Sequence, residues 1–201
     1  MNLSIYFVTP DGAEDTLVLA ALRGGATVIQ LRDKQATDAE LIAQARRLAP
    51  ACAAAGVPLI INDRLEVALA SGAAGLHIGQ SDGDPRGIRA ALGRDQILGL
   101  SIESFDQLAA LPMQDVDYIG AGPVRATRSK TNHATPIGMD GLARISAVSP
   151  VPTVAIGGVK AMDIPMLKSI GCAGLAVVSA IAQAPDPEMA TRDMFQKWRT
   201  E

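Results

Sequence analysis

Residues 26–61 read ATVIQLRDKQATDAELIAQARRLAPACAAAGVPLII, which is two apolar runs separated by one helix-like segment. The first run, 26–31, ends in polar residues, and the TDAE sequence at 37–40 is a capping box that predicts the start of a helix. An apolar stripe at helical spacing follows, and Gly56 offers a left-handed stop before the second run, 57–61. Because this connection is too long for a hairpin, the stretch predicts two parallel strands joined by a helix.

The same alternation recurs along the whole chain. Asp84-Pro85 and Asp186-Pro187 each place a capping residue before a proline, which predicts further helix starts. Strand-like runs lie at residues 4–8, 26–31, 57–61, 74–78, 96–100, 116–120, 152–156 and 174–178. Eight such units in 201 residues predict a single (β/α)8 barrel domain, at the small end for that fold. A doubly wound open sheet is the rival, although the TPDG sequence after the first run lacks its glycine-rich turn.

Composition narrows the classes of function. A hydrophobic content of 48% in 201 residues suffices for one core, so we expect one domain over residues 1–201. The aromatic content of 3% and the net charge of -3 argue against nucleic-acid binding. No leader peptide or membrane-length apolar stretch is evident, which predicts a soluble, cytoplasmic protein. Cys52 and Cys172 lack metal-type spacing and are predicted to be core residues.

Polar clusters follow almost every apolar run, at the ends that would share one rim of a barrel. That rim is where loops build active sites in this fold. Asp63 and Asp82 follow the third and fourth runs, so both carboxylates are predicted to reach one ion. Two carboxylates with phosphate oxygens and water are a normal ligand set for Mg²⁺. The alternative for Asp63 is helix capping, which needs no ligand.

Gln30, Arg32 and Lys34 alternate where the second run ends. A period of two places them on one side, so an extended chain would direct an amide, a guanidinium and an ammonium group into the barrel mouth. Arginine and lysine together are suited to a phosphate or diphosphate. A solvated polar strand end is the alternative, but Gln30 interrupts the apolar face within the run.

A second group of candidates lies in the long non-helical stretch at 121–137. Thr127, Ser129 and Lys130, together with Arg128, combine hydroxyl groups with cations, as a flexible phosphate clamp would. Loops of this length in compact domains are usually lids or disordered segments.

The last two apolar runs are followed by small residues instead of charged ones. Gly157 and Gly158 follow the seventh run, and Val178 and Ser179 follow the eighth. Barrels commonly bind a monophosphate at these two loops through backbone amides, which glycine lets the ligand approach closely. Glycines needed only for tight turns are the alternative.

The two histidines do not indicate covalent catalysis. His77 lies within the fourth run and is predicted to be a packed histidine satisfied by a neighbour, while His133 lies in the long loop. No Ser-His-Asp or Cys-His order is recognisable.

These motifs together resemble the thiamine phosphate synthase family over nearly the whole chain. The matching elements are Gln-x-Arg-x-Lys (30–34), Asn-Asp-Arg (62–64), Gly-Gln-x-Asp (79–82), Ser101, a Thr-x-Thr-Lys-like loop (127–130), Gly-Gly (157–158) and Val-Ser-Ala-Ile (178–181). Each motif is weak alone, but their order and spacing are fairly specific.

The resemblance implies a transferase that joins hydroxymethylpyrimidine diphosphate to a thiazole phosphate, releasing diphosphate in thiamine biosynthesis. The roles it implies are listed by ligand: Asp63 and Asp82 for Mg²⁺ on the diphosphate; Arg32, Lys34, Asn62, Thr127, Ser129 and Lys130 for the diphosphate; Gly157, Gly158, Val178 and Ser179 for the thiazole phosphate; Gln30 and Ser101 for the pyrimidine. Lys130, Ser101 and Arg32 would then be the catalytic residues, in a dissociative reaction that needs no protein nucleophile.

The chain also departs from the family pattern. Arg125 and Ala126 stand where an aromatic residue and a proline are usual, Ser129 replaces a threonine, and Glu103 replaces a histidine near Ser101. Thiazole tautomerases share the barrel but tend to lose the diphosphate and metal residues, which this chain keeps. A catalytically silent regulator that binds thiamine precursors is the third alternative. The oligomeric state stays open, with a homodimer as one option.

Overall fold

Eight parallel strands close into a barrel in the computed structural model, which describes residues 1–126 and 135–201. Each strand pairs with the next in the sequence, and β1 pairs with β8 to complete the ring. The strands are β1 (Ile5–Val8), β2 (Val28–Leu31), β3 (Leu59–Asn62), β4 (Gly75–Ile78), β5 (Ile97–Ile102), β6 (Tyr118–Ala121), β7 (Thr153–Ile156) and β8 (Gly174–Val177). The predicted (β/α)8 barrel is confirmed, and the open doubly wound sheet is excluded.

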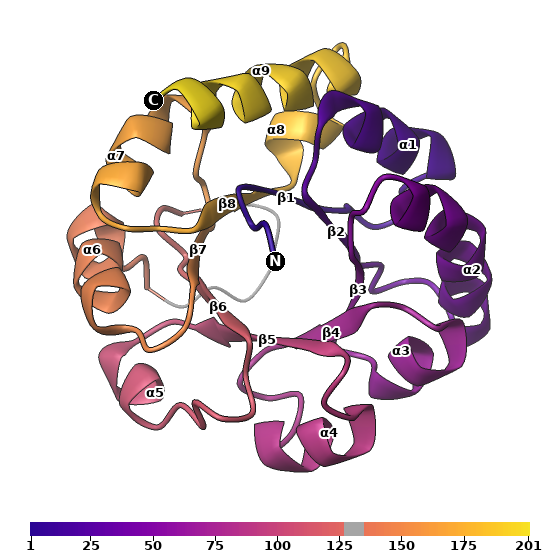
Figure 1. Ribbon diagram of the computed structural model, residues 1–201, viewed down its shortest axis with the longest axis horizontal. Coiled ribbons are helices and arrows are strands. Elements are labelled where there is room, and N and C mark those ends of the chain that lie inside the picture. Colours follow the sequence, from indigo (N-terminus) through magenta and orange to yellow (C-terminus); the bar gives the residue numbers. More distant parts are fainter. Residues whose placement is uncertain (127–134) are drawn as a thin grey trace.

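Helices surround the ring of strands on the outside (Figure 1). They are α1 (Asp15–Gly24), α2 (Asp38–Ala54), α3 (Leu65–Ser71), α4 (Pro85–Leu92), α5 (Phe105–Ala109), α6 (Gly138–Val148), the 3-10 turn η1 (Ala161–Asp163), α7 (Ile164–Ser169), α8 (Ser179–Ala182) and α9 (Pro187–Thr200). Within the described ranges, none of these helices has both the length and the apolar character needed to span a bilayer.

Short sequence signals set several helix ends as predicted. The Thr37 hydroxyl accepts a bond from the Glu40 amide (3.3 Å), and the Thr37 amide donates to the Glu40 carboxylate (2.7 Å), which completes the capping box of α2. Asp84 and Asp186 cap α4 and α9 through their side chains, each just before the predicted proline. These caps satisfy amides that have no acceptor within the helix.

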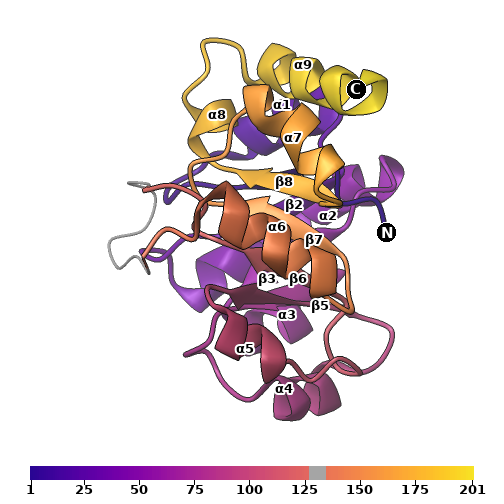
Figure 2. The same ribbon diagram turned by 90° about the vertical axis from the view of Figure 1, so that its left-hand side faces the viewer.

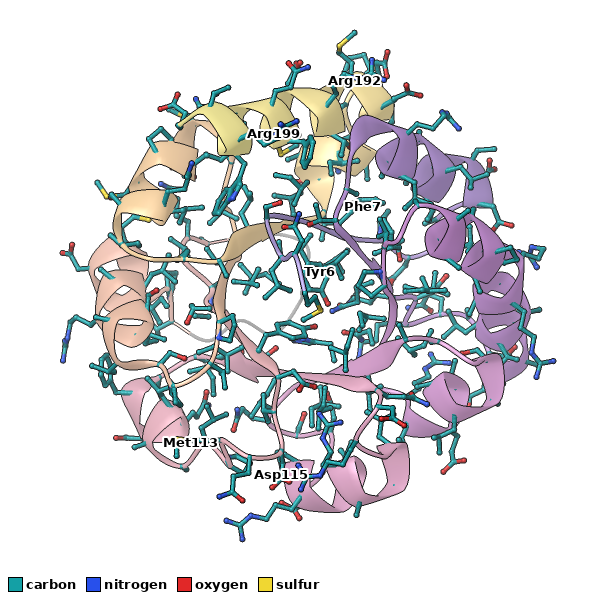
Figure 3. The ribbon with its side chains drawn as sticks, in the orientation of Figure 1. Tyr6, Phe7, Met113, Asp115, Arg192 and Arg199 are labelled. Atoms are coloured by element: carbon teal, nitrogen blue, oxygen red, sulfur yellow. The ribbon has the colours of Figure 1, made fainter. Side chains whose placement is uncertain are left out.

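Side chains alternate along each strand between the barrel interior and the helix layer. On β1, Tyr6 lies inside the ring of strands, whereas Phe7 points outward toward the helices (Figure 3). The interior cluster is small: Leu3, Tyr6, Val8, Val28, Ile60, Tyr118, Val154 and Ala176. The N-terminus lies at the centre of the ring in Figure 1 and at the end opposite α8 in Figure 2. Buried Leu3 therefore fills that end, and the other end is open to loops.

The chain after β6 first runs beside β7. The amides of Val124 and Arg125 donate to the carbonyls of Ile156 (2.9 Å) and Gly157 (2.9 Å), so the described start of this connection is fixed to the end of β7. The connection ends at α6, close to the predicted boundary at residue 137. The predicted clamp residues Thr127, Ser129 and Lys130 lie outside the described residues.

Candidate active site

A cavity of about 1080 Å³ opens at the carboxyl ends of the strands, the predicted rim. Its lining draws on the ends of all eight strands or the loops that follow them. Every site residue predicted within the described ranges lines it: Gln30, Arg32, Lys34, Asn62, Asp63, Asp82, Ser101, Gly157, Gly158, Val178 and Ser179. The strand-exit rule thus correctly predicted that these side chains share one cavity, and their individual roles stay predictions.

The two predicted metal ligands meet on one side of this cavity. Burial and then the neighbouring Asp63 carboxyl raise the pKa of Asp82 above its ordinary value, which places the two carboxyl groups against each other. Asp63 has a φ of 62°, a left-handed conformation that is rare outside glycine, and its amide donates to the His77 carbonyl (2.8 Å). Asp82 is oriented by the Gly79 amide, which donates to its Oδ2 (2.7 Å). Asp63 therefore points into the cavity rather than capping α3, whose start has no side-chain cap.

This acidic pair suits a divalent cation better than an all-protein metal cage. Residues 1–126 and 135–201 contain no group of three or more His, Cys, Asp or Glu side chains placed to hold a metal. Two carboxylates that repel each other in a half-buried site gain from a shared cation, and Mg²⁺ normally takes its other ligands from phosphate and water. The donor set fits Mg²⁺, which stays a prediction for this chain.

Cations stand next to the acidic pair. Lys34 forms an ion pair with Asp63. The Arg32 guanidinium donates to Asp11 Oδ1 (2.8 Å), and the Lys34 amide donates to the same oxygen (3.0 Å). Asp11 also lines the cavity and holds the β2 exit in place. Asp11 was not predicted from the sequence, although it lies three residues after the end of the first predicted strand and so met the same rim criterion.

The opposite side of the cavity is lined by backbone. Gly157 and Gly158 have φ values of 86° and 70°, and a Cβ atom on Gly157 would lie 2.5 Å from the Pro123 Cβ. Glycine is thus needed here so that the β6 connection can pass close to β7, which agrees with the alternative that these glycines serve a tight turn. It also leaves backbone atoms facing the cavity. Val178 and Ser179 begin α8, whose first amides have no acceptor within the helix. This side offers the donors that a monophosphate needs.

Arg125 anchors the start of the β6 connection through its guanidinium group. Its guanidinium makes a two-bond fork to the Asp163 carboxylate (2.7 and 2.8 Å) and also reaches the Gly158 carbonyl (3.2 Å). This fork holds the pKa of Asp163 below its ordinary value. The start of the β6 connection is therefore anchored beside the glycine pair by an ion pair.

A hydrogen-bonded chain crosses the barrel interior at the floor of the cavity, which its members Gln30, His77 and Ser101 line. It runs from Gln30 Nε2 to the Tyr6 hydroxyl (2.8 Å), on to the Tyr118 hydroxyl (2.6 Å), to His77 Nδ1 (2.9 Å), and from His77 Nε2 to Ser101 Oγ (3.0 Å). The prediction that His77 is satisfied by neighbours is confirmed. The two tyrosines were missed, although they are the only tyrosines of the sequence and both fall within predicted strands.

The pairing of Ser101 with His77 was also not expected from the sequence. A serine nucleophile would need a carboxylate behind the histidine to orient and stabilise the imidazolium form. Here the second ring nitrogen meets the neutral hydroxyl of Tyr118 instead. Cys52 and Cys172 are buried, as predicted, and burial raises the pKa of each thiol to about 11. These side chains give no support to covalent catalysis.

The fold and the cavity together define the class: a (β/α)8-barrel protein whose mouth combines an acidic pair with cations and a glycine-lined rim. The family described as "Thiamine monophosphate synthase" matches residues 5–181 by its sequence profile. The chain belongs to this family.

Individual relatives match this chain over nearly its full length. A thiamine-phosphate synthase of Azorhizobium caulinodans is 43% identical over 96% of this chain and 93% of its own, and one of Xanthobacter autotrophicus is 46% identical over 95% and 93%. The solved thiamine phosphate pyrophosphorylase of Pyrococcus furiosus superposes with a TM-score of 0.89 at 30% identity, covering 98% of this chain and 96% of that one. A 3-hexulose-6-phosphate synthase at 16% identity and a TM-score of 0.70 shares the fold.

Proposed function

We propose that this protein is a thiamine phosphate synthase, which transfers the pyrimidinylmethyl group of hydroxymethylpyrimidine diphosphate to the nitrogen of a thiazole phosphate and releases diphosphate. The observation that carries the proposal is that one cavity has two differently built sides, each with groups that can bind an anion. The acidic pair and the cations of the β2 exit lie on one side, and the glycine and α8 backbone lies on the other. Two differently built phosphate sites are what two phosphorylated substrates require.

The diphosphate is assigned to the side with charged side chains. Asp63 and Asp82 would hold Mg²⁺, which would supply positive charge to the leaving group when bound. Arg32 and Lys34 are placed to contact the same diphosphate, with Asn62 beside them. Lys130, Ser129 and Thr127 are proposed to complete this site from the connection after β6. The reaction gains from this positive charge because the leaving group takes both electrons of the breaking C–O bond.

The thiazole phosphate is assigned to the backbone side, where Gly157, Gly158, Val178 and Ser179 line the cavity. Gln30 and Ser101 lie between the two sides, where the pyrimidine ring would sit. The thiazole nitrogen would then attack the carbon that the diphosphate leaves, and no protein nucleophile is needed. This agrees with the absence of an activated one among the described residues.

The alternatives are weaker on these residues. A thiazole tautomerase has no use for a diphosphate site, yet Asp63, Asp82, Arg32 and Lys34 all face the cavity. The relatives named above carry the synthase name. A silent precursor-binding protein would not need two carboxylates to be held against each other. A cytoplasmic location and a homodimeric state stay predictions.

The test is to incubate the purified protein with both precursors and Mg²⁺ and to measure thiamine phosphate and diphosphate. We expect both products in equal amounts, and no reaction when EDTA removes the metal. Isomerisation of the thiazole without any coupled product would support the tautomerase instead. Binding of both precursors with no chemistry would support the silent regulator.

A further inference from the structure

The buried chain of Gln30, Tyr6, Tyr118, His77 and Ser101 joins five strands across the barrel interior, and only its two ends are the residues assigned above to the pyrimidine. The middle members are almost completely buried: Tyr6 is 2% exposed, Tyr118 1% and His77 6%. Burial raises the pKa of both phenols, so each keeps its proton and can act as a donor at any ordinary pH. Each phenol therefore brings one proton to the chain, and that proton can serve only one of its hydrogen bonds.

Two glycines make room for this chain. A Cβ atom on Gly99 would lie 2.2 Å from Tyr118 Cζ and 2.5 Å from His77 Nδ1, and one on Gly120 would lie 3.3 Å from His77 Cε1. Gly99 pairs with His77 on one side and with Tyr118 on the other, and Gly120 follows Tyr118 by two residues on β6, so β5 and β6 give up side-chain volume where the rings pass. Glycine in the middle of a strand costs backbone entropy and usually marks a close approach of this kind.

The order of donors along the chain follows from counting protons. The Gln30 amide nitrogen can only donate, so Tyr6 accepts from it. The buried Tyr6 hydroxyl then has one proton of its own, and leaving that proton unused would cost free energy, so burial favours donation to Tyr118, 2.6 Å away. In that order Tyr118 would give its proton to His77 Nδ1, 2.9 Å away. Because Nδ1 is then an acceptor, the proton of a neutral His77 ring must be on Nε2, where it is donated to Ser101.

We propose that Tyr6, Tyr118 and His77 are positioning residues that set the hydrogen-bonding polarity of the two pyrimidine contacts. In this order Ser101 Oγ accepts from His77 and keeps its own proton for the cavity, while Gln30 gives one of its two amide hydrogens to Tyr6, which orients the amide and leaves Oε1 as its acceptor. The cavity floor thus offers one donor and one acceptor to the ligand. An aminopyrimidine matches this pair with a ring nitrogen and an exocyclic amino group, whereas a ring bearing a carbonyl in place of the amino group would set two acceptors together. This assignment of the ligand rests on the proposed function.

The direct test is the tautomer of His77, which is independent of activity. The sequence contains two histidines, so the His133→Gln protein labelled with ¹⁵N reports on His77 alone. At pH 8 we expect the neutral ring with the proton on Nε2. In Tyr118→Phe the fixed tautomer should be lost, with a clear change in the Nδ1 chemical shift. A wild-type ring protonated on Nδ1, or one unchanged in Tyr118→Phe, would overturn the proposal even if the enzyme is an active synthase.

The kinetic test measures whether the direction of these hydrogen bonds affects kcat/KM for the pyrimidine substrate. Tyr118→Phe keeps the ring and removes the hydroxyl, and we expect roughly a tenfold loss in kcat/KM for the pyrimidine substrate, as for one lost hydrogen bond of about 1.4 kcal/mol. The KM for the thiazole phosphate should be unchanged. The loss should nearly vanish when Tyr118→Phe is made in a Ser101→Ala protein, because both changes remove the same donor. Equal losses in the two backgrounds would show a merely structural role.

Thr153→Val is the matched control. Thr153 is 2% exposed on β7, and its hydroxyl has no hydrogen-bond partner among the described residues. Removing it deletes a buried barrel hydroxyl outside the chain, so activity and the His77 tautomer should both match the wild type. A loss as large as that of Tyr118→Phe would mean that any buried hydroxyl matters equally, which contradicts the proposal.

Discussion

At the scale of single residues, the acidic pair formed by Asp63 and Asp82 lowers the stability of the folded chain and is suited to binding a ligand. Asp63 is the one residue other than glycine in the described ranges with a positive φ, and Asp82 is held beside it with a raised pKa. Both features cost free energy in the folded chain. Lys34 offsets part of the repulsion through its ion pair with Asp63. Unfavourable features kept together in a cavity indicate a site built for a ligand.

Asp63→Asn should lower turnover by orders of magnitude with the fold intact. Asparagine tolerates the left-handed conformation, so this change removes the charge with little added backbone strain, unlike alanine. Steady-state kinetics in Mg²⁺, with circular dichroism as the control for folding, check this outcome. Activity close to the wild type would remove Asp63 from the metal site.

Asp82→Asn should be as stable as the wild type or more stable in EDTA, and still inactive. Because the folded-state pKa of Asp82 is raised, its ionised form is disfavoured by folding, and stability is lost as the pH rises through that pKa. Above it, asparagine removes the penalty while its carbonyl can still accept from Gly79. Thermal unfolding at pH 8 measures the difference, and a clearly lower midpoint for the variant would contradict the repulsion argument.

At the scale of elements, the helix and strand signals were readable because they are local. The capping box of α2 and the aspartate–proline starts of α4 and α9 depend on residues three positions apart, and each was predicted correctly. The fork between Arg125 and Asp163 was not predictable, because it joins the β6 connection to η1 across 38 positions. The sequence showed only that Arg125 departs from the family pattern. The structure shows that its guanidinium pairs with Asp163.

Asp163→Asn should destabilise the protein at neutral pH and much less in acid. The Arg125 fork lowers the pKa of Asp163 below its ordinary value of 3.8, so its contribution is fully present above about pH 4 and lost as the pH falls through the lower folded-state pKa. Urea unfolding at pH 7 and at pH 3 measures the difference. The control is Asp193→Asn on the exposed side of α9, which should show no such pH dependence.

At the scale of the whole molecule, the closed ring explains why the candidate site residues could be grouped from the sequence, and why the contacts inside the barrel could not be predicted. A (β/α)8 barrel brings every strand exit to one rim, so Gln30, Asp63, Asp82 and Ser101 could be grouped from their places in the sequence alone. The Tyr6–Tyr118 contact spans the ring from β1 to β6, and it depends on the register and on which residues point inward. A one-residue change of register would turn either ring outward, so no local pattern could have revealed it.

Ligands that join several strand ends on the charged side of the rim should stabilise the whole barrel. Mg²⁺ with diphosphate should raise the thermal midpoint more than the sum of each alone, because the metal connects the carboxylates to the phosphate. Saturation at 100 times Kd corresponds to about 2.7 kcal/mol. Scanning calorimetry checks this, with the Asp82→Asn protein as the control that should lose the joint effect. Additive shifts would argue that metal and diphosphate bind at separate places.

The glycine at position 99 carries one more consequence. It lines no part of the cavity, yet any larger residue there would meet Tyr118 and His77 at once. A selection for thiamine-independent growth, run on a library randomised at every codon, should therefore reject changes at Gly99 as firmly as changes at the acidic pair. Positions that tolerate no substitution in this protein would then include a glycine that makes room for Tyr118, as well as the residues that contact a substrate.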